Sequence, residues 1–288
     1  MKSANRFQKI YSFFATKIAI GIFALVVPVW MIEWVGQNYL GKLNLPEDLQ
    51  NGIISIAVSA AAVYTYLLIF RLLEKRKTNA LDPSAFLENA GLGFLTGLIL
   101  QCLFILILYL KGYYQILVIH PASYLLPSLI FALTAGFVAE LIIRGVIFRI
   151  IEERFGTTIS IVFMILLFGV FHFNSKGSTV ISLAATCIAS GFLPSAAYVF
   201  SRSLWVPIFL HFAWDFAEPG IFGGINPGIS AGKSLITAQI TGPVILTGGE
   251  TGPQNSLQAL ILCLATGVFF LWLAHKKNRM IPFPQRQT

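Results

Sequence analysis

The feature that most constrains this chain is a series of apolar runs, each close to twenty residues long and nearly free of charge. A run of about 20 residues is long enough to cross the hydrocarbon core of a bilayer as a helix. The composition agrees, because 56% of the 288 residues are hydrophobic and only 11% are charged, whereas soluble domains carry about 25% charged residues. We expect an all-α polytopic membrane helix bundle, a single membrane domain over residues 1–288. Its transmembrane helices, about eight, are predicted at 11–35, 52–71, 90–110, 124–150, 157–173, 178–200, 204–217 and 256–274.

Lys and Arg residues gather at alternate ends of these runs. They are frequent before residue 11, in 71–77, in 149–154, at Arg202 and after residue 275, and sparse in the other connections. The positive-inside rule therefore predicts that both termini are cytoplasmic. The net charge of +8 belongs to segments that flank the membrane, where they meet anionic lipid. We expect the lipid bilayer as a partner and no nucleic acid.

The fourth run contains two charges in an otherwise uncharged stretch. Glu140 and Arg144 are four residues apart, so they lie on one face of a helix and can pair. A charge in the middle of the bilayer costs about 2.5–3.5 kcal/mol on insertion scales. An ionisable pair at this depth therefore indicates a functional site.

Two later runs carry polar insertions of the same kind. His172 closes the fifth run, and His211 with Asp215 forms a second i,i+4 pair in the seventh. A carboxylate and an imidazole can hold a water molecule and take its proton. A second imidazole, oriented by an Asp, can stabilise a developing oxyanion. The set is therefore adequate for hydrolysis if the three helices share one polar cavity.

Other interpretations of the same residues remain open. Buried polar side chains also join membrane helices by hydrogen bonds without any catalytic role. Glu140, His172, His211 and Asp215 are all ligand types that zinc accepts, although no His-Glu-x-x-His motif is present. We expect no cofactor and no metal, with zinc as the second choice. A transporter or ion pathway is a third class, which no internal repeat supports.

The three insertions resemble the prokaryotic CAAX-protease and bacteriocin-processing (CPBP, or Abi) family of intramembrane proteases. That family has Glu-Glu-x-x-x-Arg, Phe-x-x-x-His and His-x-x-x-Asn/Asp motifs on successive helices. The matching residues here are Glu140 with Arg144, Phe168 with His172, and His211 with Asp215. The resemblance covers residues 124–217 as a core motif region.

The resemblance implies an eight-helix endopeptidase of the CAAX prenyl protease type in a prokaryotic plasma membrane. It implies that a glutamate activates water without a required metal. The substrate would be a membrane-associated peptide or protein. By the resemblance, His172 would work with the carboxylate on water, His211 and Asp215 would form the oxyanion side, and Arg144 would hold the carboxylate.

One position departs from the family pattern. The first Glu of the pair, which usually has the role of general base, is Ala139 here. Adjacent helix positions point about 100° apart, so Glu140 does not simply replace it. The chain is then either an enzyme in which Glu140 has taken over, or a catalytically inactive relative that acts in membrane binding, immunity or assembly.

Two expectations concern the geometry. His172 falls near the outer end of its run and Glu140 nearer the middle of its own, so a shared cavity requires a tilted helix or shifted helix ends. The connection at 218–255 contains nine glycines between Gly220 and Gly252. This content favours a mobile lid or a re-entrant segment.

Overall fold

A computed structural model describes residues 13–72, 74–75, 77–223 and 233–283. It is a polytopic helical bundle, as predicted. Within these residues, six segments are long and apolar enough to cross a membrane, namely Phe14–Leu40, Glu47–Leu72, Pro83–Leu110, Ala122–Phe155, Val180–Ser201 and Leu257–Lys276. Two of the eight predicted spans form shorter helices, α7 (Thr157–His172, 16 residues) and α10 (Trp205–Phe216, 12 residues).

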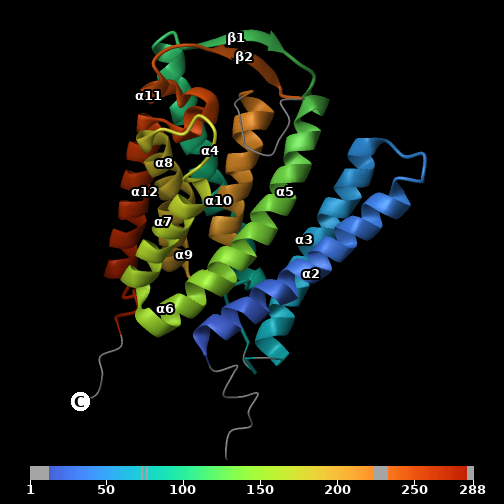
Figure 1. The fold of residues 1–288 in the computed structure, drawn as a ribbon, viewed down its shortest axis with the longest axis vertical. Helices are drawn as coiled ribbons and strands as arrows, with labels where there is room; N and C mark the ends of the chain where they lie inside the picture. Colours follow the sequence, from blue (N-terminus) through green and yellow to red (C-terminus); the bar gives the residue numbers. More distant parts are fainter. Residues whose placement is uncertain (1–12, 73, 76, 224–232, 284–288) are drawn as a thin grey trace, which may run out of the picture.

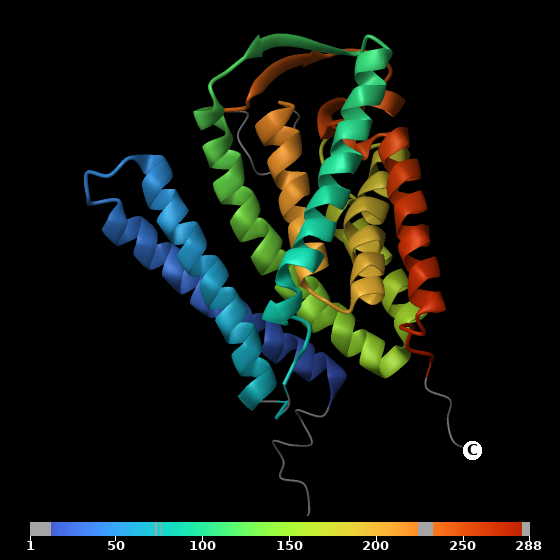
Figure 2. The same cartoon turned by 180° about the vertical axis from the view of Figure 1, so that it is seen from behind.

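The helices fall into two groups in space. Helices α2 (Phe14–Leu40) and α3 (Glu47–Leu72) form a hairpin at one side of the bundle, which splays away from α5 toward its loop (Figure 1). The larger group surrounds α10 (Figure 2). It comprises α4 (Phe86–Leu110), α5 (Leu126–Glu140), α6 (Arg149–Phe155), α7, α8 (Val180–Thr186), α9 (Leu193–Ser201) and α12 (Leu257–Lys276).

The described part of the chain contains three stretches of π-helix, each continuous with an α-helix. The π-helix η3 (Leu141–Phe148) joins α5 to α6, η4 (Cys187–Phe192) joins α8 to α9, and η5 (Ala217–Ile221) follows α10. A π-helix is rare and is frequently found at a functional site. None of them is predicted from the sequence, because no residue pattern separates a π-turn from the surrounding apolar helix.

A small sheet, absent from the all-α prediction, covers one end of the bundle. Strand β1 (Tyr114–Ile119) pairs antiparallel with β2 (Ile236–Ile240). The two strands lie above α10, between the ends of α4 and α5 (Figure 1). They come from connections more than a hundred residues apart, so neither strand had a partner nearby in the sequence.

The glycine-rich connection contains more regular structure than its glycine content predicts. Beyond residue 232 it forms β2, the short helix α11 (Val244–Thr247) and the 3-10 turns η6 (Gly249–Thr251) and η7 (Pro253–Asn255). Its segment 224–232 lies outside the described residues. Part of the predicted lid is thus regular structure at the sheet-covered end of the bundle.

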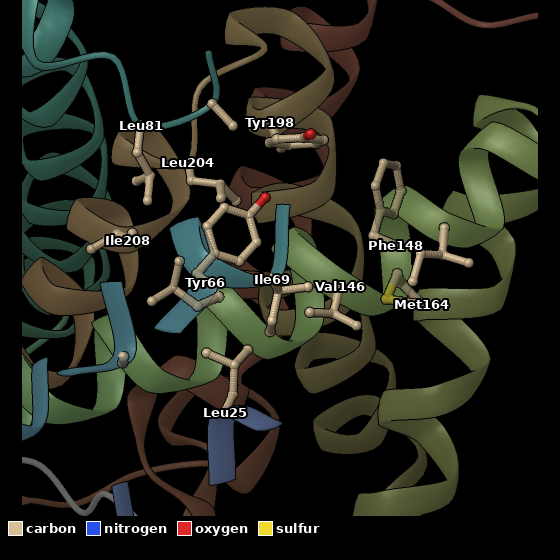
Figure 3. Close-up of a cluster of buried hydrophobic side chains, with 14 of the residues drawn as sticks. Leu25, Tyr66, Ile69, Leu81, Val146, Phe148, Met164, Tyr198, Leu204 and Ile208 are labelled. Carbon is tan, nitrogen blue, oxygen red and sulfur yellow. The ribbon is translucent and has the colours of Figure 1, made fainter. Parts of the chain in front are cut away.

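The main hydrophobic cluster lies toward the opposite end. Tyr66, Phe148, Met164, Leu204 and Ile208 are among its fully buried members (Figure 3). They come from α3, η3, α7, the turn before α10, and α10 itself. The cluster therefore joins the α2–α3 hairpin to the helices that carry the predicted site residues.

Close contact between helices holds α10 in place. Gly93 and Gly97 of α4 lie directly against its backbone, and Gly136 of α5 approaches it from another side. A Cβ at Gly97 would stand 2.7 Å from the Leu210 carbonyl oxygen. Small residues four apart are the usual means by which membrane helices pack this closely. These three glycines therefore set the position of α10, the helix that carries His211 and Asp215.

Candidate active site

Glu140 and Arg144 form an ion pair inside the bundle. Glu140 ends α5 and Arg144 lies in the π-helix that follows. Arg144 Nη1 donates to Glu140 Oε1 at 2.8 Å, and each side chain is 1% exposed. Isolated charges cannot be buried cheaply, so each of them depends on the other.

Arg144 also fixes a second helix. Its Nη2 donates to the carbonyl oxygens of Ser190 and Gly191 in η4, and its guanidinium lies 5.5 Å from the centre of the Phe168 ring. A π-helix leaves some carbonyls without their usual partner, and these two accept from a cation. Arg144 therefore links the π-helices η3 and η4.

His211 on α10 lies between two carboxylates. Its Nδ1 is 2.9 Å from Glu140 Oε1, and its Nε2 is 3.3 Å from Asp215 Oδ2. A carboxylate can only accept, so a ring that bonds to both must donate from both nitrogens, as an imidazolium does. The predicted i,i+4 pair is thus joined to the predicted Glu–Arg pair in one chain of contacts.

His172, the last residue of α7, borders the same cavity as Glu140 and His211. Its Nδ1 lies 3.0 Å from the Phe168 carbonyl oxygen. That oxygen only accepts, so Nδ1 carries the proton and Nε2 is left as an acceptor in the neutral ring. No hydrogen bond joins His172 to Glu140 within the described residues. The two are related by the cavity that both of them border.

A cavity of about 360 Å³ lies among these groups. All five predicted site residues line it: Glu140, Arg144, His172, His211 and Asp215. Ala139 lines it too. The depth difficulty between His172 and Glu140 is resolved because one cavity extends along the helices from the ion pair to the end of α7.

The cavity also contains neutral polar residues that the sequence did not single out. Gln254 and Asn255 line it from η7, and Thr186 lines it from α8. Thr186 Oγ1 donates to Asn255 Oδ1 at 2.7 Å, and Trp214 Nε1 donates to Gln254 Oε1 at 2.6 Å. Neutral residues in a connection carry no motif, so only the folded chain shows that they belong to the site.

A second buried carboxylate supports this wall of the cavity. Glu218 is fully buried in η5. It accepts from Gln101 Nε2 at 3.3 Å and from the Gln254 backbone N–H at 3.4 Å. Glu218 is not among the predicted site residues, because it begins the glycine-rich connection predicted at 218–255. Its partners are 117 and 36 residues away.

The described residues contain no group of three or more His, Cys, Asp or Glu side chains arranged to hold a metal ion. His211 already has a carboxylate at each ring nitrogen. A zinc ligand needs a free nitrogen lone pair. The expectation that no metal is required stays a prediction, which chelation would test.

The fold and this cavity define an integral membrane helix bundle with a buried site built from carboxylates, a guanidinium and two imidazoles. A comparison with protein families gives a match over about a third of the chain. Residues 121–217 match the family of type II CAAX prenyl endopeptidases called Rce1-like. This match confirms the resemblance to the CPBP proteases that the three motifs indicated. No curated protein and no solved structure matches the chain.

Proposed function

We propose that this chain is an intramembrane endopeptidase that hydrolyses a membrane-associated peptide or protein. The observation that carries the proposal is the environment of Glu140. Its Oε1 is held by Arg144 and His211, while its buried Oε2 has no hydrogen-bond partner among the described residues. The family match to CAAX prenyl endopeptidases supports the same activity.

In the proposed reaction, Glu140 Oε2 and His172 Nε2 hold the attacking water. One of them takes a proton as the water oxygen bonds to the carbonyl carbon of the substrate. The tetrahedral intermediate then loses its amine as the C–N bond breaks, and the stored proton passes to the leaving nitrogen. Arg144 keeps Glu140 oriented throughout.

We assign His211 a positioning role. The family resemblance places His211 and Asp215 on the oxyanion side. In this structure both ring nitrogens of His211 face carboxylates, so neither is directed at a substrate oxygen. We therefore propose that His211 holds Glu140 and that Asp215 orients His211, since the partner of one ring nitrogen fixes the role of the other.

The same charges favour an internal bond as the target. Among the described residues that line the cavity, Arg144 is the one Lys or Arg, and it is engaged with Glu140 and two carbonyls. The ring of His211 is engaged with Glu140 and Asp215. A carboxypeptidase needs a cation for the free terminal carboxylate of its substrate. Cleavage within the chain is the better fit.

The test is cleavage of a prenylated CAAX peptide, or of a membrane-bound reporter, by the purified protein. Glu140→Gln and His172→Ala should each abolish turnover, since a missing general base costs about 10²–10⁴-fold. The matched controls are Glu88→Gln and His275→Ala, which change exposed residues outside the cavity. Turnover that survives both site changes would refute the assignment. Exhaustive chelation should leave the rate unchanged, and a loss restored by zinc would favour the metal alternative.

An inactive relative is the second candidate, and Ala139 favours it. The carboxylate that the family places there is replaced by a methyl group at the cavity wall. Such a protein would bind a membrane peptide or partner, as in immunity or assembly. Under this alternative the native chain shows no turnover and Ala139→Glu creates it. Native turnover that the added Glu does not raise would exclude this alternative.

A further inference from the structure

The cavity is not centred in the bundle. On α7 it is bordered by the last turn, at Phe168 and His172, and on α10 by the second half of the helix, from Leu210 onward. The turn η7, just before α12 begins, also borders the cavity. These elements all meet at the end covered by β1 and β2 (Figure 1). We call this the sheet end.

The opposite end, which we call the basic end, is closed. Four segments run from the cavity toward the basic end. On each of them, a residue between the cavity and that end belongs to the hydrophobic cluster. These residues are Phe148 on η3, Met164 on α7, Tyr198 on α9 and Ile208 on α10 (Figure 3). Each is buried, at no more than 5% exposure. Water and substrate therefore have no path through this cluster.

Ion pairs and the C-terminal segment close the basic end further. Arg202 holds Glu152 by two hydrogen bonds, at 2.6 and 3.0 Å, and Arg149 holds Glu74. The backbone of Ile281 exchanges hydrogen bonds with Thr157, at 2.9 and 2.8 Å. These contacts join α6, α7, the residues that follow α3 and α9, and the chain after α12 into one packed layer.

The two ends also differ in charge. The described Lys and Arg residues at the basic end are Lys17, Arg71, Lys75, Lys77, Arg149, Arg154, Arg202, Lys276, Lys277 and Arg279. Those at the sheet end are Lys42, Lys111, Lys176 and Lys233. An excess of Lys and Arg in the short connections marks the cytoplasmic face. The basic end is therefore the cytoplasmic one, and the cavity lies in the other half of the molecule.

We propose that substrates reach this site from the non-cytoplasmic face, so that the peptide cleaved is one exposed outside the cytoplasm while anchored in the membrane. The direction of access follows from the cavity and the charges alone. The cleavage of such a peptide rests on the proposed function. The neutral amides and hydroxyl of Gln254, Asn255 and Thr186 line this part of the cavity, and groups of this kind suit the backbone of an extended peptide.

The test measures access with a thiol reagent that cannot cross membranes. In a bacterial host, Cys102, Cys187 and Cys263 are first replaced by Ala, and single cysteines are then introduced. Lys176→Cys reports the sheet end and Lys277→Cys the basic end, since both residues are exposed. Thr186→Cys reports the cavity.

In intact spheroplasts the reagent should label Lys176→Cys and Thr186→Cys and leave Lys277→Cys unlabelled. Inverted vesicles should give the reverse pattern. Labelling of Lys277→Cys from outside would overturn the orientation. Labelling of Thr186→Cys only from the cytoplasmic side, or only after solubilisation in detergent, would overturn access from the external face.

A membrane-anchored reporter completes the test. Its cleavage segment is placed outside the cytoplasm in one version and inside in the other, and only the first should be cut. Cleavage of the second version alone would overturn the proposal. If labelling shows the expected sidedness but neither reporter nor detergent-solubilised peptide is cleaved, the proposed protease function fails while the direction of access stands.

Discussion

The packing of α4 against α10 gives the sharpest prediction, because the two helices touch through glycine. A Cβ placed on Gly97 would lie 2.7 Å from the Leu210 carbonyl oxygen and 2.9 Å from the Ala213 Cβ. Ordinary contacts begin at 3.4 Å, so Gly97→Ala must move α10 away by about 0.7 Å. Leu210 and Ala213 flank His211, which is held to Glu140 at 2.9 Å.

Two effects of Gly97→Ala follow, one on stability and one on turnover. Inserting a methyl group into a packed interface costs about 1–3 kcal/mol, which lowers Tm by about 2–12 °C for a chain of this size. Displacement of a site residue by about 1 Å can cost about 10²-fold in rate. Turnover, if the native chain shows it, should therefore fall further than stability alone explains.

The control is Gly91→Ala on the same helix, where a Cβ would meet nothing within 4 Å. Both variants gain the same helix propensity, about 1 kcal/mol, so the difference between them isolates the contact. Melting of the purified proteins in detergent measures it. Equal Tm values for the two variants would refute the close packing of α4 on α10.

Two further predictions concern buried charges. Arg144→Met should lower the free energy of unfolding by about 3–5 kcal/mol, because it removes the guanidinium and leaves the buried Glu140 carboxylate with His211 alone. The double variant with Glu140→Gln should lose less stability than the sum of the two single changes. Additive losses, measured by unfolding in a denaturing detergent, would count against the ion pair. Glu218→Leu should cost about 1–3 kcal/mol for each donor left unpaired, Gln101 and the Gln254 backbone, whereas Glu218→Gln keeps an acceptor and should cost less. Equal melting temperatures for the two Glu218 variants would argue against its role in holding η7.

The sequence predicted much of this fold because the bilayer leaves a chain few options. Each apolar run has to be a helix, since its backbone groups find no water inside the membrane. The same constraint made Glu140, Arg144, His172, His211 and Asp215 conspicuous, and the structure brings all five to one cavity. Outside the apolar runs this constraint no longer applies. The sheet, the turn η7 and the position of Gln254 depend on contacts between distant segments, which no local pattern encodes.

The position before Glu140 decides between the two proposed functions. Ala139 lines the cavity beside a group of charges that balance one another. Arg144 and the doubly donating His211 carry the two positive charges, and Glu140 and Asp215 carry the two negative charges. A carboxylate at 139 would find no cation left, so Ala139→Glu should destabilise the protein by about 2–4 kcal/mol, the cost of an unpaired charge at this depth. If Glu140 is the base, Ala139→Glu should lose this stability without any gain in turnover rate. The turnover rate of Ala139→Gln should then equal that of Ala139→Glu. If the base is missing, Ala139→Glu alone should create turnover despite the lower Tm. The stability loss is expected in both cases, so a variant that melts like the native chain would show that the charges around Glu140 are not balanced as described.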